Sequence, residues 1–123
     1  MQNDACPFCN FSSLALVAEN DLAFGVRDKF LVMPLHTLLI PKRHVADVLQ
    51  TTAAEREAMH ELAAKCRSEI CQEDPSVGGF NFGSNVGQAA GQKIIHAHLH
   101  LILRRTGDIP PPPARSNEKA WSP

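Results

Sequence analysis

The sequence predicts an α+β fold: an antiparallel β-sheet of about five strands with one long helix and a short one. Three observations predict it. Short apolar runs are separated by turn-forming residues along much of the chain. Residues 51–72 form the clearest helical pattern, and residues 94–103 alternate histidine with aliphatic residues, which is typical of a strand. The chain has 123 residues, enough for one domain with a hydrophobic core.

The first half of the chain predicts three strands. Apolar runs at residues 14–18 and 22–26 flank Glu19, Asn20 and Asp21. Asn and Asp favour turns, so these runs predict a β-hairpin. Residues 37–40 predict a third strand, which Pro41 ends.

The long helix is predicted from its ends and its apolar stripe. Thr52 and Glu55 have the spacing of a capping box, and Asp74 followed by proline ends the helix. Residues at helical spacing form one apolar face that includes Ala58, Leu62, Cys66, Ile70, Met59 and Ala63. We therefore assign Cys66 to the core, and we assign neither Cys66 nor Cys71 to a metal.

The second half of the chain predicts a fourth strand at 80–84, a Gly-rich loop at 85–93 and the histidine strand. Residues 110–113 are all proline and favour an extended polyproline conformation. We expect a domain at residues 1–107, whose segment 1–10 carries a metal motif, and a Pro-rich tail at 108–123.

Composition excludes some classes of function. The formal net charge is −1, with 12 basic and 13 acidic side chains, which argues against broad binding to nucleic acid. The most apolar stretch, at 30–40, is too short to cross a bilayer, and the start lacks the pattern of a signal peptide. We expect a cytoplasmic protein with no membrane partner, whose four cysteines are thiols or metal ligands rather than disulfides.

The alternating histidines are the strongest functional signal. In a strand, His96, His98 and His100 share one face, and aliphatic residues occupy the other. Histidine is a poor filler of strands, but near neutral pH it can bind metal, attack an electrophile or move a proton. The loop before them contains Gly87 and Gly91, which let backbone N–H groups approach an anion. Together these features predict a phosphate-binding site.

A second motif, Cys6-Pro7-Phe8-Cys9, lies near the N-terminus. Such a pair can chelate zinc, act as a redox dithiol or be incidental. A redox pair is expected at the start of a helix after a buried strand, and no strand is predicted before Cys6.

These motifs resemble the histidine triad (HIT) superfamily, and the resemblance covers residues 6–104. The triad itself, the preceding Asn85-x-Gly87-x-x-Ala-Gly91-Gln92 and an upstream block from Pro34 to His44 carry it. The chain is most similar to small bacterial HIT hydrolases between the Hint and Fhit branches. The third histidine favours hydrolysis, because nucleotidyl transferases of the superfamily typically have glutamine there.

The resemblance implies a mechanism and a set of residues. His98 attacks the α-phosphorus of a nucleotide conjugate, while a backbone carbonyl of the same strand holds its other ring nitrogen. His100 contacts the phosphate and His36 supports it, so His98, His100 and His36 form the catalytic group. The implied substrate-binding residues are Asn85, Gly91, Gln92, Lys93, Asp28, Phe8 and Phe24. Among these, Phe8 and Phe24 line a base pocket and Asp28 binds the ribose.

The resemblance also implies a structural zinc ion. Two histidines complete the site of the cysteine pair, giving the ligands Cys6, Cys9, His44 and His96. Four protein ligands leave no open position for catalysis. Family members are commonly homodimers, which we expect here too.

The chain departs from its relatives at two places. Arg104 and Arg105 follow the triad strand, but Leu103 stands where the Fhit-like branch often has proline. Lys93 occupies a position that usually carries a small hydroxyl or acidic residue; it either favours a highly charged polyphosphate or faces solvent.

From the resemblance we expect a hydrolase of nucleoside phosphoramidates, acyl adenylates or dinucleoside polyphosphates. A nucleotide-binding regulatory module with little turnover, or a protein whose three histidines all serve zinc, are the alternatives.

Overall fold

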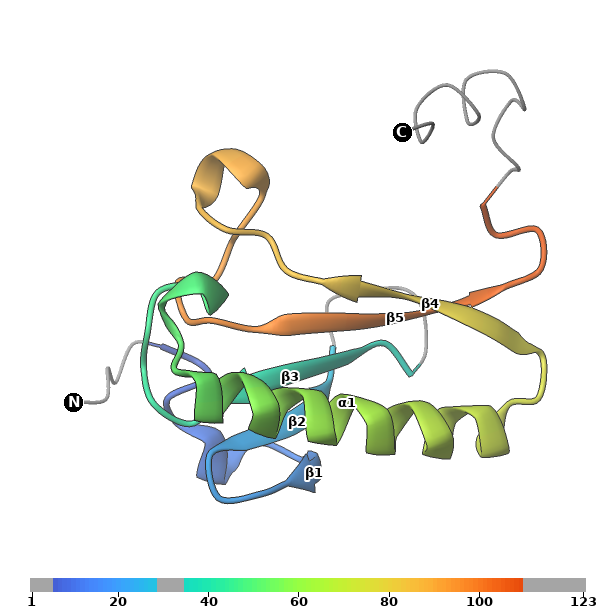
Figure 1. Cartoon of the computed structure of the whole chain (residues 1–123), viewed down its shortest axis with the longest axis horizontal. Coiled ribbons are helices and arrows are strands. Elements are labelled where there is room, and N and C mark those ends of the chain that lie inside the picture. Colours follow the sequence, from blue (N-terminus) through green and yellow to red (C-terminus); the bar gives the residue numbers. More distant parts are fainter. Residues whose placement is uncertain (1–5, 29–34, 110–123) are drawn as a thin grey trace.

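The computed structural model describes residues 6–28 and 35–109 and contains a five-stranded antiparallel sheet in the order β1-β2-β3-β5-β4. The helix α1 runs along one face of this sheet (Figure 1). The elements are β1 (Leu16–Glu19), β2 (Ala23–Arg27), β3 (Thr37–Pro41), α1 (Ala53–Glu73), β4 (Val77–Gly83) and β5 (Leu99–Arg105). The predicted α+β class, sheet and long helix are confirmed.

Single 3-10 turns take the place of the expected short second helix in the described ranges. They are η1 (Phe11–Ser13), η2 (Val48–Gln50) and η3 (Gln88–Ala90). The prolines at 110–113 and most of the expected tail lie outside the described residues, as do residues 1–5 of the N-terminal segment. In the part of the chain that the structure describes, no helix is both long and apolar enough to cross a membrane.

The predicted hairpin and helix cap are both present. The side chain of Asn20 accepts hydrogen bonds from the backbone N–H groups of Leu22 (3.2 Å) and Ala23 (2.9 Å), which closes the turn between β1 and β2. At the start of α1, the Thr52 hydroxyl accepts from the Glu55 amide at 3.1 Å. The Glu55 carboxylate accepts from the Thr52 amide at 2.8 Å, which completes the capping box.

Two hydrophobic clusters cover the sheet. The larger one joins the buried face of α1 to the aliphatic face of β5, and it includes Met59, Leu62, Cys66, Ile70, Leu99, Leu101 and Leu103. Cys66 is fully buried there and Cys71 is exposed, in line with the assignment of Cys66 to the core. The smaller cluster packs the N-terminal segment against β2 and β3.

The histidine strand is shorter than predicted. β5 begins at Leu99, so His100 lies in the strand while His96 and His98 precede it. Before the strand, the amide of Ala97 bonds to the carbonyl of Val45 at 2.8 Å, outside the regular ladder between β3 and β5. The prediction that all three histidines belong to one regular strand was therefore wrong, because this segment pairs with the loop after β3. The rings remain neighbours, since the centroids of His98 and His100 are 5.1 Å apart.

Candidate active site and metal site

The ring of His98 is held by a hydrogen bond to a backbone carbonyl nearby in the chain. Its Nδ1 lies 2.7 Å from the carbonyl oxygen of His96, and a carbonyl can only accept, so Nδ1 carries the hydrogen. The ring is buried, with the edge of Phe8 packed at 5.4 Å between centroids. The hydroxyl of Ser84 donates to the His98 carbonyl at 2.6 Å. With the hydrogen on Nδ1, a second proton is absent from Nε2 in the neutral form of the ring, and the Nε2 lone pair is then available.

His36 and His100 form a second pair beside it. His36 precedes β3, and its Nε2 lies 3.2 Å from Nδ1 of His100 on the adjacent strand β5. Burial lowers the pKa of His100 to about 4, with smaller contributions from His98 and His36. Burial also lowers the pKa of His36. Both imidazoles are therefore neutral at pH 7.

Asp28 lies close to this pair. It directly follows β2, its backbone amide bonds to the His36 carbonyl at 2.8 Å, and its carboxylate lies within 4.8 Å of the ring nitrogens of His36 and His100. The three residues thus bring one carboxylate and two neutral imidazoles together. Within the described ranges, His98 belongs neither to this group nor to the cysteine group of metal donors.

Cys6, Cys9, His44 and His96 bring four potential metal donors together, all within 4.8 Å of one another. The shorter contacts are Cys9 Sγ to His44 Nδ1 at 3.0 Å, Cys6 Sγ to His96 Nδ1 at 3.3 Å, and Nδ1 to Nδ1 of the two histidines at 3.1 Å. Zinc bonds of about 2.0–2.3 Å in a tetrahedron place donors roughly 3.3–3.8 Å apart. The separations of 3.0–3.6 Å span from slightly below this range to within it, and two thiols with two imidazoles are a donor set that suits a zinc ion.

A backbone contact sets the tautomer of His96. Its Nε2 lies 2.8 Å from the carbonyl oxygen of Pro41, the last residue of β3. Nε2 must therefore donate, which leaves the lone pair of Nδ1 facing the two cysteines. Hydrogen-bond donation from the distal ring nitrogen to a carbonyl is what metal-bound histidines commonly show. This supports the fit of a metal at the group.

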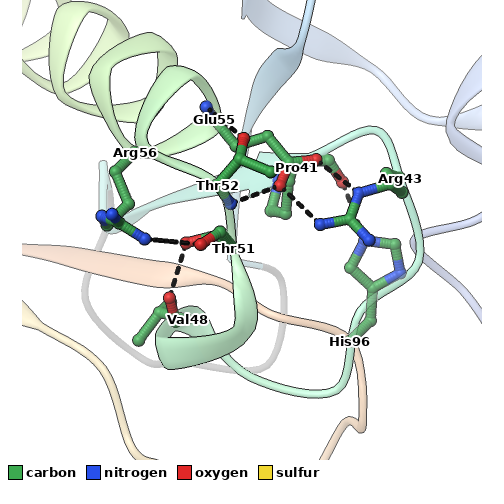
Figure 2. Close-up of polar contacts among 8 residues, drawn as sticks. All are labelled: Pro41, Arg43, Val48, Thr51, Thr52, Glu55, Arg56 and His96. Atoms are coloured by element: carbon green, nitrogen blue, oxygen red, sulfur yellow. Dashed lines mark hydrogen bonds and ion pairs between the residues drawn. The ribbon is translucent and has the colours of Figure 1, made fainter.

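An ion pair ties the same loop to the helix (Figure 2). Arg43, next to His44, donates from Nε and Nη2 to the Glu55 carboxylate at 2.9 and 2.8 Å. The Arg43 guanidinium is the main cause that lowers the pKa of Glu55. Glu55 thus completes the helix cap and positions the loop that carries a metal donor.

The Gly-rich loop is closed from inside by Gln92. Its Oε1 accepts from the Gly87 amide at 2.8 Å, and its Nε2 donates to the carbonyls of Ala46 (2.6 Å) and Ile94 (3.0 Å). Gly87 and Gly91 have φ values of 89° and 95°, which favour glycine. Asn85 and Lys93 are exposed. The amide of Gln92 therefore organises the loop, whereas Asn85 and Lys93 lie at its surface.

The two phenylalanines occupy different surroundings. Phe8 packs against both His96 and His98, whereas Phe24 is fully buried and stacks on Phe11 with centroids 5.0 Å apart. Sequence reasoning missed three contributors: Ser84, the Arg43–Glu55 pair, and the contact between Arg104 and Asn81. The residues involved are common polar types with no distinctive spacing in the sequence, and only the fold brings them to their partners.

A five-stranded sheet covered by one long helix, with the histidines at and just before strands β3 and β5, defines a class of α+β protein. Comparison with known proteins gives the family. The family model described as HIT domain matches residues 12–107. An uncharacterized HIT-like protein of Mycoplasma genitalium is 35% identical over 103 residues, covering 80% of this chain and 72% of that one. The chain belongs to the HIT domain family.

Two further relatives are relevant to the chemistry. The crystal structure of a Zn-bound histidine triad family protein from Mycobacterium smegmatis superposes with a TM-score of 0.73 at 30% identity, covering 85% of this chain and 78% of that one. The adenylylsulfatase HINT3 of Arabidopsis thaliana is 32% identical over 112 residues, which cover 88% of this chain but 56% of that protein.

Proposed function

We propose that this protein is a nucleotidyl hydrolase that cleaves nucleotide conjugates at the α-phosphate through a covalent nucleotidyl-His98 intermediate. The observation that carries this proposal is the 2.7 Å bond from Nδ1 of His98 to the His96 carbonyl, which directs the free lone pair to Nε2. A neutral, oriented imidazole is a good nucleophile near pH 7. The family of the chain, and the loop of donors beside His98, agree with this chemistry.

The first step forms a bond between Nε2 of His98 and the α-phosphorus and breaks the bond to the leaving group, which takes the electron pair. In the second step water attacks the same phosphorus and gives up a proton to the solvent, while the bond between phosphorus and Nε2 breaks and its electron pair returns to Nε2. The nucleoside monophosphate then leaves and His98 is restored with its hydrogen on Nδ1. We assign to His36 a hydrogen bond donated from Nε2 to Nδ1 of His100. In that tautomer, Nε2–H of His100 donates to a phosphoryl oxygen.

The remaining substrate contacts follow from position. Asn85 and the amides around Gly91 supply donors to the phosphate, Gln92 holds them in place, and Lys93 adds a cation at the loop surface. Asp28, beside His36 and His100, binds the ribose hydroxyls. Phe8 forms the wall of the base pocket nearest to His98, and Phe24, fully buried in the same hydrophobic cluster, supports that pocket from behind.

A substrate panel tests the proposal. Parent protein, His98→Ala and Glu57→Ala are assayed with adenosine 5′-phosphoramidate, adenosine 5′-phosphosulfate and diadenosine triphosphate. Glu57 is exposed on α1, outside the hollow between α1 and β4, and serves as the control. We expect His98→Ala to lose essentially all turnover and the parent to yield a nucleotidyl-histidine adduct by mass spectrometry. Undiminished turnover by His98→Ala would reject the nucleophile, and tight nucleotide binding with no turnover by the parent would favour a regulatory module.

We further propose that Cys6, Cys9, His44 and His96 hold one structural zinc ion. With four protein donors the ion has no open position, so it supplies rigidity rather than a Lewis acid. It joins the N-terminal segment to the chain just before β5, and therefore fixes the backbone on which His98 depends. The distances and the tautomer of His96 support this assignment.

We also propose a homodimer that pairs through β4 and α1. In the described sheet β4 is an edge strand, and between it and α1 lies a hollow of about 930 Å³ beside Phe82, whose side chain is 44% exposed. Light scattering tests this: Phe82→Lys should yield a monomer, while Leu49→Lys, a change at another exposed apolar residue, should not. A monomeric parent would reject the dimer.

For the cellular location of the protein we propose the cytoplasm, where cysteine thiols stay reduced.

A further inference from the structure

A hollow extends from the catalytic histidines along the open face of β5. Its volume is about 440 Å³, and it is lined by His36, Asn81, Ser84, Asn85, His100 and Ile102, among others. In the ladder between β4 and β5, Gly83 lies opposite His100 and Gly79 opposite Arg104. A Cβ added at either glycine would meet nothing within 4 Å, so this side of the strand pair is open.

Arg104 lies beside this hollow, where its side chain bonds to Asn81, one of the lining residues. It follows His100 and Ile102 at alternate positions of β5, so all three share the face opposite α1. Its Nε donates to Oδ1 of Asn81 at 2.7 Å, and Asn81 lies opposite Ile102 in the ladder. The guanidinium is thus anchored by one nitrogen beside a residue that lines the hollow, and both Nη groups remain for a ligand.

The charge of Arg104 is not neutralised by a carboxylate within the described ranges. The ion pairs there join Lys42 to Glu19, Arg43 to Glu55 and Arg105 to Asp74. The charge of Arg104 acts on His36: burial is the main cause of the lowered pKa of His36, the Asp28 carboxylate opposes it, and Arg104 adds a smaller lowering effect. Arg105, by contrast, points to the other side of the strand and bonds to Asp74 and Ser76.

We propose that Arg104, fixed by Asn81, binds the leaving group of the substrate and makes the enzyme selective for leaving groups that are tetrahedral oxyanions, sulfate or phosphate. This inference rests on the proposed nucleotidyl transfer to His98. A guanidinium offers parallel N–H donors that match two oxygens of such an anion. His100 and Asn81 line the same hollow, and the guanidinium is bonded to Asn81, so an anion attached to an α-phosphate at His100 would extend toward Arg104.

The chemistry explains why selectivity results. When the bond between the α-phosphorus and a bridging oxygen breaks, the electron pair goes to that oxygen, and sulfate or a phosphate chain leaves with more negative charge. A cation stabilises this charge directly. When the leaving group is an amine, the departing nitrogen must instead gain a proton, which a permanently charged guanidinium does not give.

The test compares substrates that share the adenylyl group and differ in the leaving group. Parent, Arg104→Gln and Arg105→Gln are assayed with adenosine 5′-phosphosulfate, diadenosine triphosphate and adenosine 5′-phosphoramidate. We expect Arg104→Gln to lower kcat/KM for an anionic leaving group about tenfold or more relative to the phosphoramidate, the loss of one charged hydrogen-bonded contact. Arg105→Gln, the neighbouring arginine on the opposite face, should leave the ratio between substrates unchanged.

The outcomes separate the two proposals. A selective loss with the phosphosulfate alone assigns the site to sulfate, and a selective loss with the triphosphate alone assigns it to a phosphate chain. An equal loss on all three substrates, or no loss, would overturn the role of Arg104 while leaving the nucleotidyl hydrolase intact. A parent protein that turns over none of the three rejects the proposed function itself.

Discussion

His98 donates a 2.7 Å hydrogen bond from Nδ1 to the carbonyl oxygen of His96. The ring of His96 faces the other way, with Nδ1 at 3.3 Å from Cys6 Sγ and Nε2 on the Pro41 carbonyl. His96 therefore contributes its ring to the metal donors and its carbonyl to the neighbouring imidazole. A movement of the metal donors would rotate the proposed nucleophile.

Removal of a metal donor provides the first prediction. Cys9→Ser should lose one zinc per chain and lower the free energy of unfolding by several kcal/mol, because structural zinc sites contribute on the order of 10 kcal/mol. Turnover should fall as well, since the His96 carbonyl loses its support. Metal analysis, urea denaturation and the hydrolase assay measure the three effects.

Cys71→Ser is the matched control, because Cys71 is exposed on α1 and far along the chain from the donor group. It should keep both the metal and the stability of the parent. A parent with no zinc, or with two tightly bound ions per chain, would contradict the closed four-donor site.

Glu55 gives a prediction on stability. Glu55→Gln keeps the size of the side chain but removes the charge that accepts from Arg43 and from the Thr52 amide. We expect a loss of about 1–2 kcal/mol in the free energy of unfolding. Urea denaturation followed by circular dichroism measures it, with Glu57→Gln, an exposed neighbour on the same helix, as the control. Equal effects of the two changes would show that the cap and the ion pair add nothing.

Much of the fold could be predicted because local patterns determine it. Asn20 closes its hairpin and Thr52 caps its helix through contacts within three residues along the chain. Such contacts are readable from spacing alone. The start of β5 was not readable, because the segment around Ala97 bonds to Val45, which is distant in the sequence.

In the candidate site, too, the sequence predicts which residues take part but not how their atoms are arranged. The alternation of histidines indicates that they are functional, but not which atoms face which partner. Only the fold places the Pro41 carbonyl on Nε2 of His96 and so leaves Nδ1 as the proposed metal donor. The same holds for Gln92: the motif predicts a phosphate contact, whereas the packed loop engages its amide with three backbone groups. Tertiary hydrogen bonds of this kind have no signature in spacing.

His100 gives a prediction on pH. Its pKa is lowered to about 4 by burial, whereas in the unfolded chain it is about 6.5. Between these values the unfolded chain binds a proton that the folded chain does not, so the free energy of unfolding falls as the pH drops from about 6.5 toward 4. His100→Gln should make this acid-dependent loss smaller.

Urea denaturation at several pH values above and below 6.5 measures the effect as a difference in slope between variant and parent. Leu49→Gln, a change at an exposed residue that binds no proton, should keep the slope of the parent. If His100→Gln also keeps it, the burial of His100 does not govern the acid response.

The loop gives a prediction that separates position from charge. In Gln92→Glu, a carboxylate oxygen replaces the Nε2 group that donates to the carbonyls of Ala46 and Ile94. The two carbonyl oxygens then lose their donor and face a negatively charged oxygen instead. Because Gln92 is only 5% exposed, water cannot relieve this, and we expect a loss of about 2–3 kcal/mol in the free energy of unfolding. The loop should open, and adenosine monophosphate should bind more weakly as an inhibitor.

Gln88→Glu is the control, because it adds the same charge at an exposed position of the same loop. If both variants weaken nucleotide binding alike while keeping the stability of the parent, charge rather than loop geometry is responsible. If only Gln92→Glu weakens nucleotide binding and also loses stability, the buried amide sets the geometry of the phosphate donors.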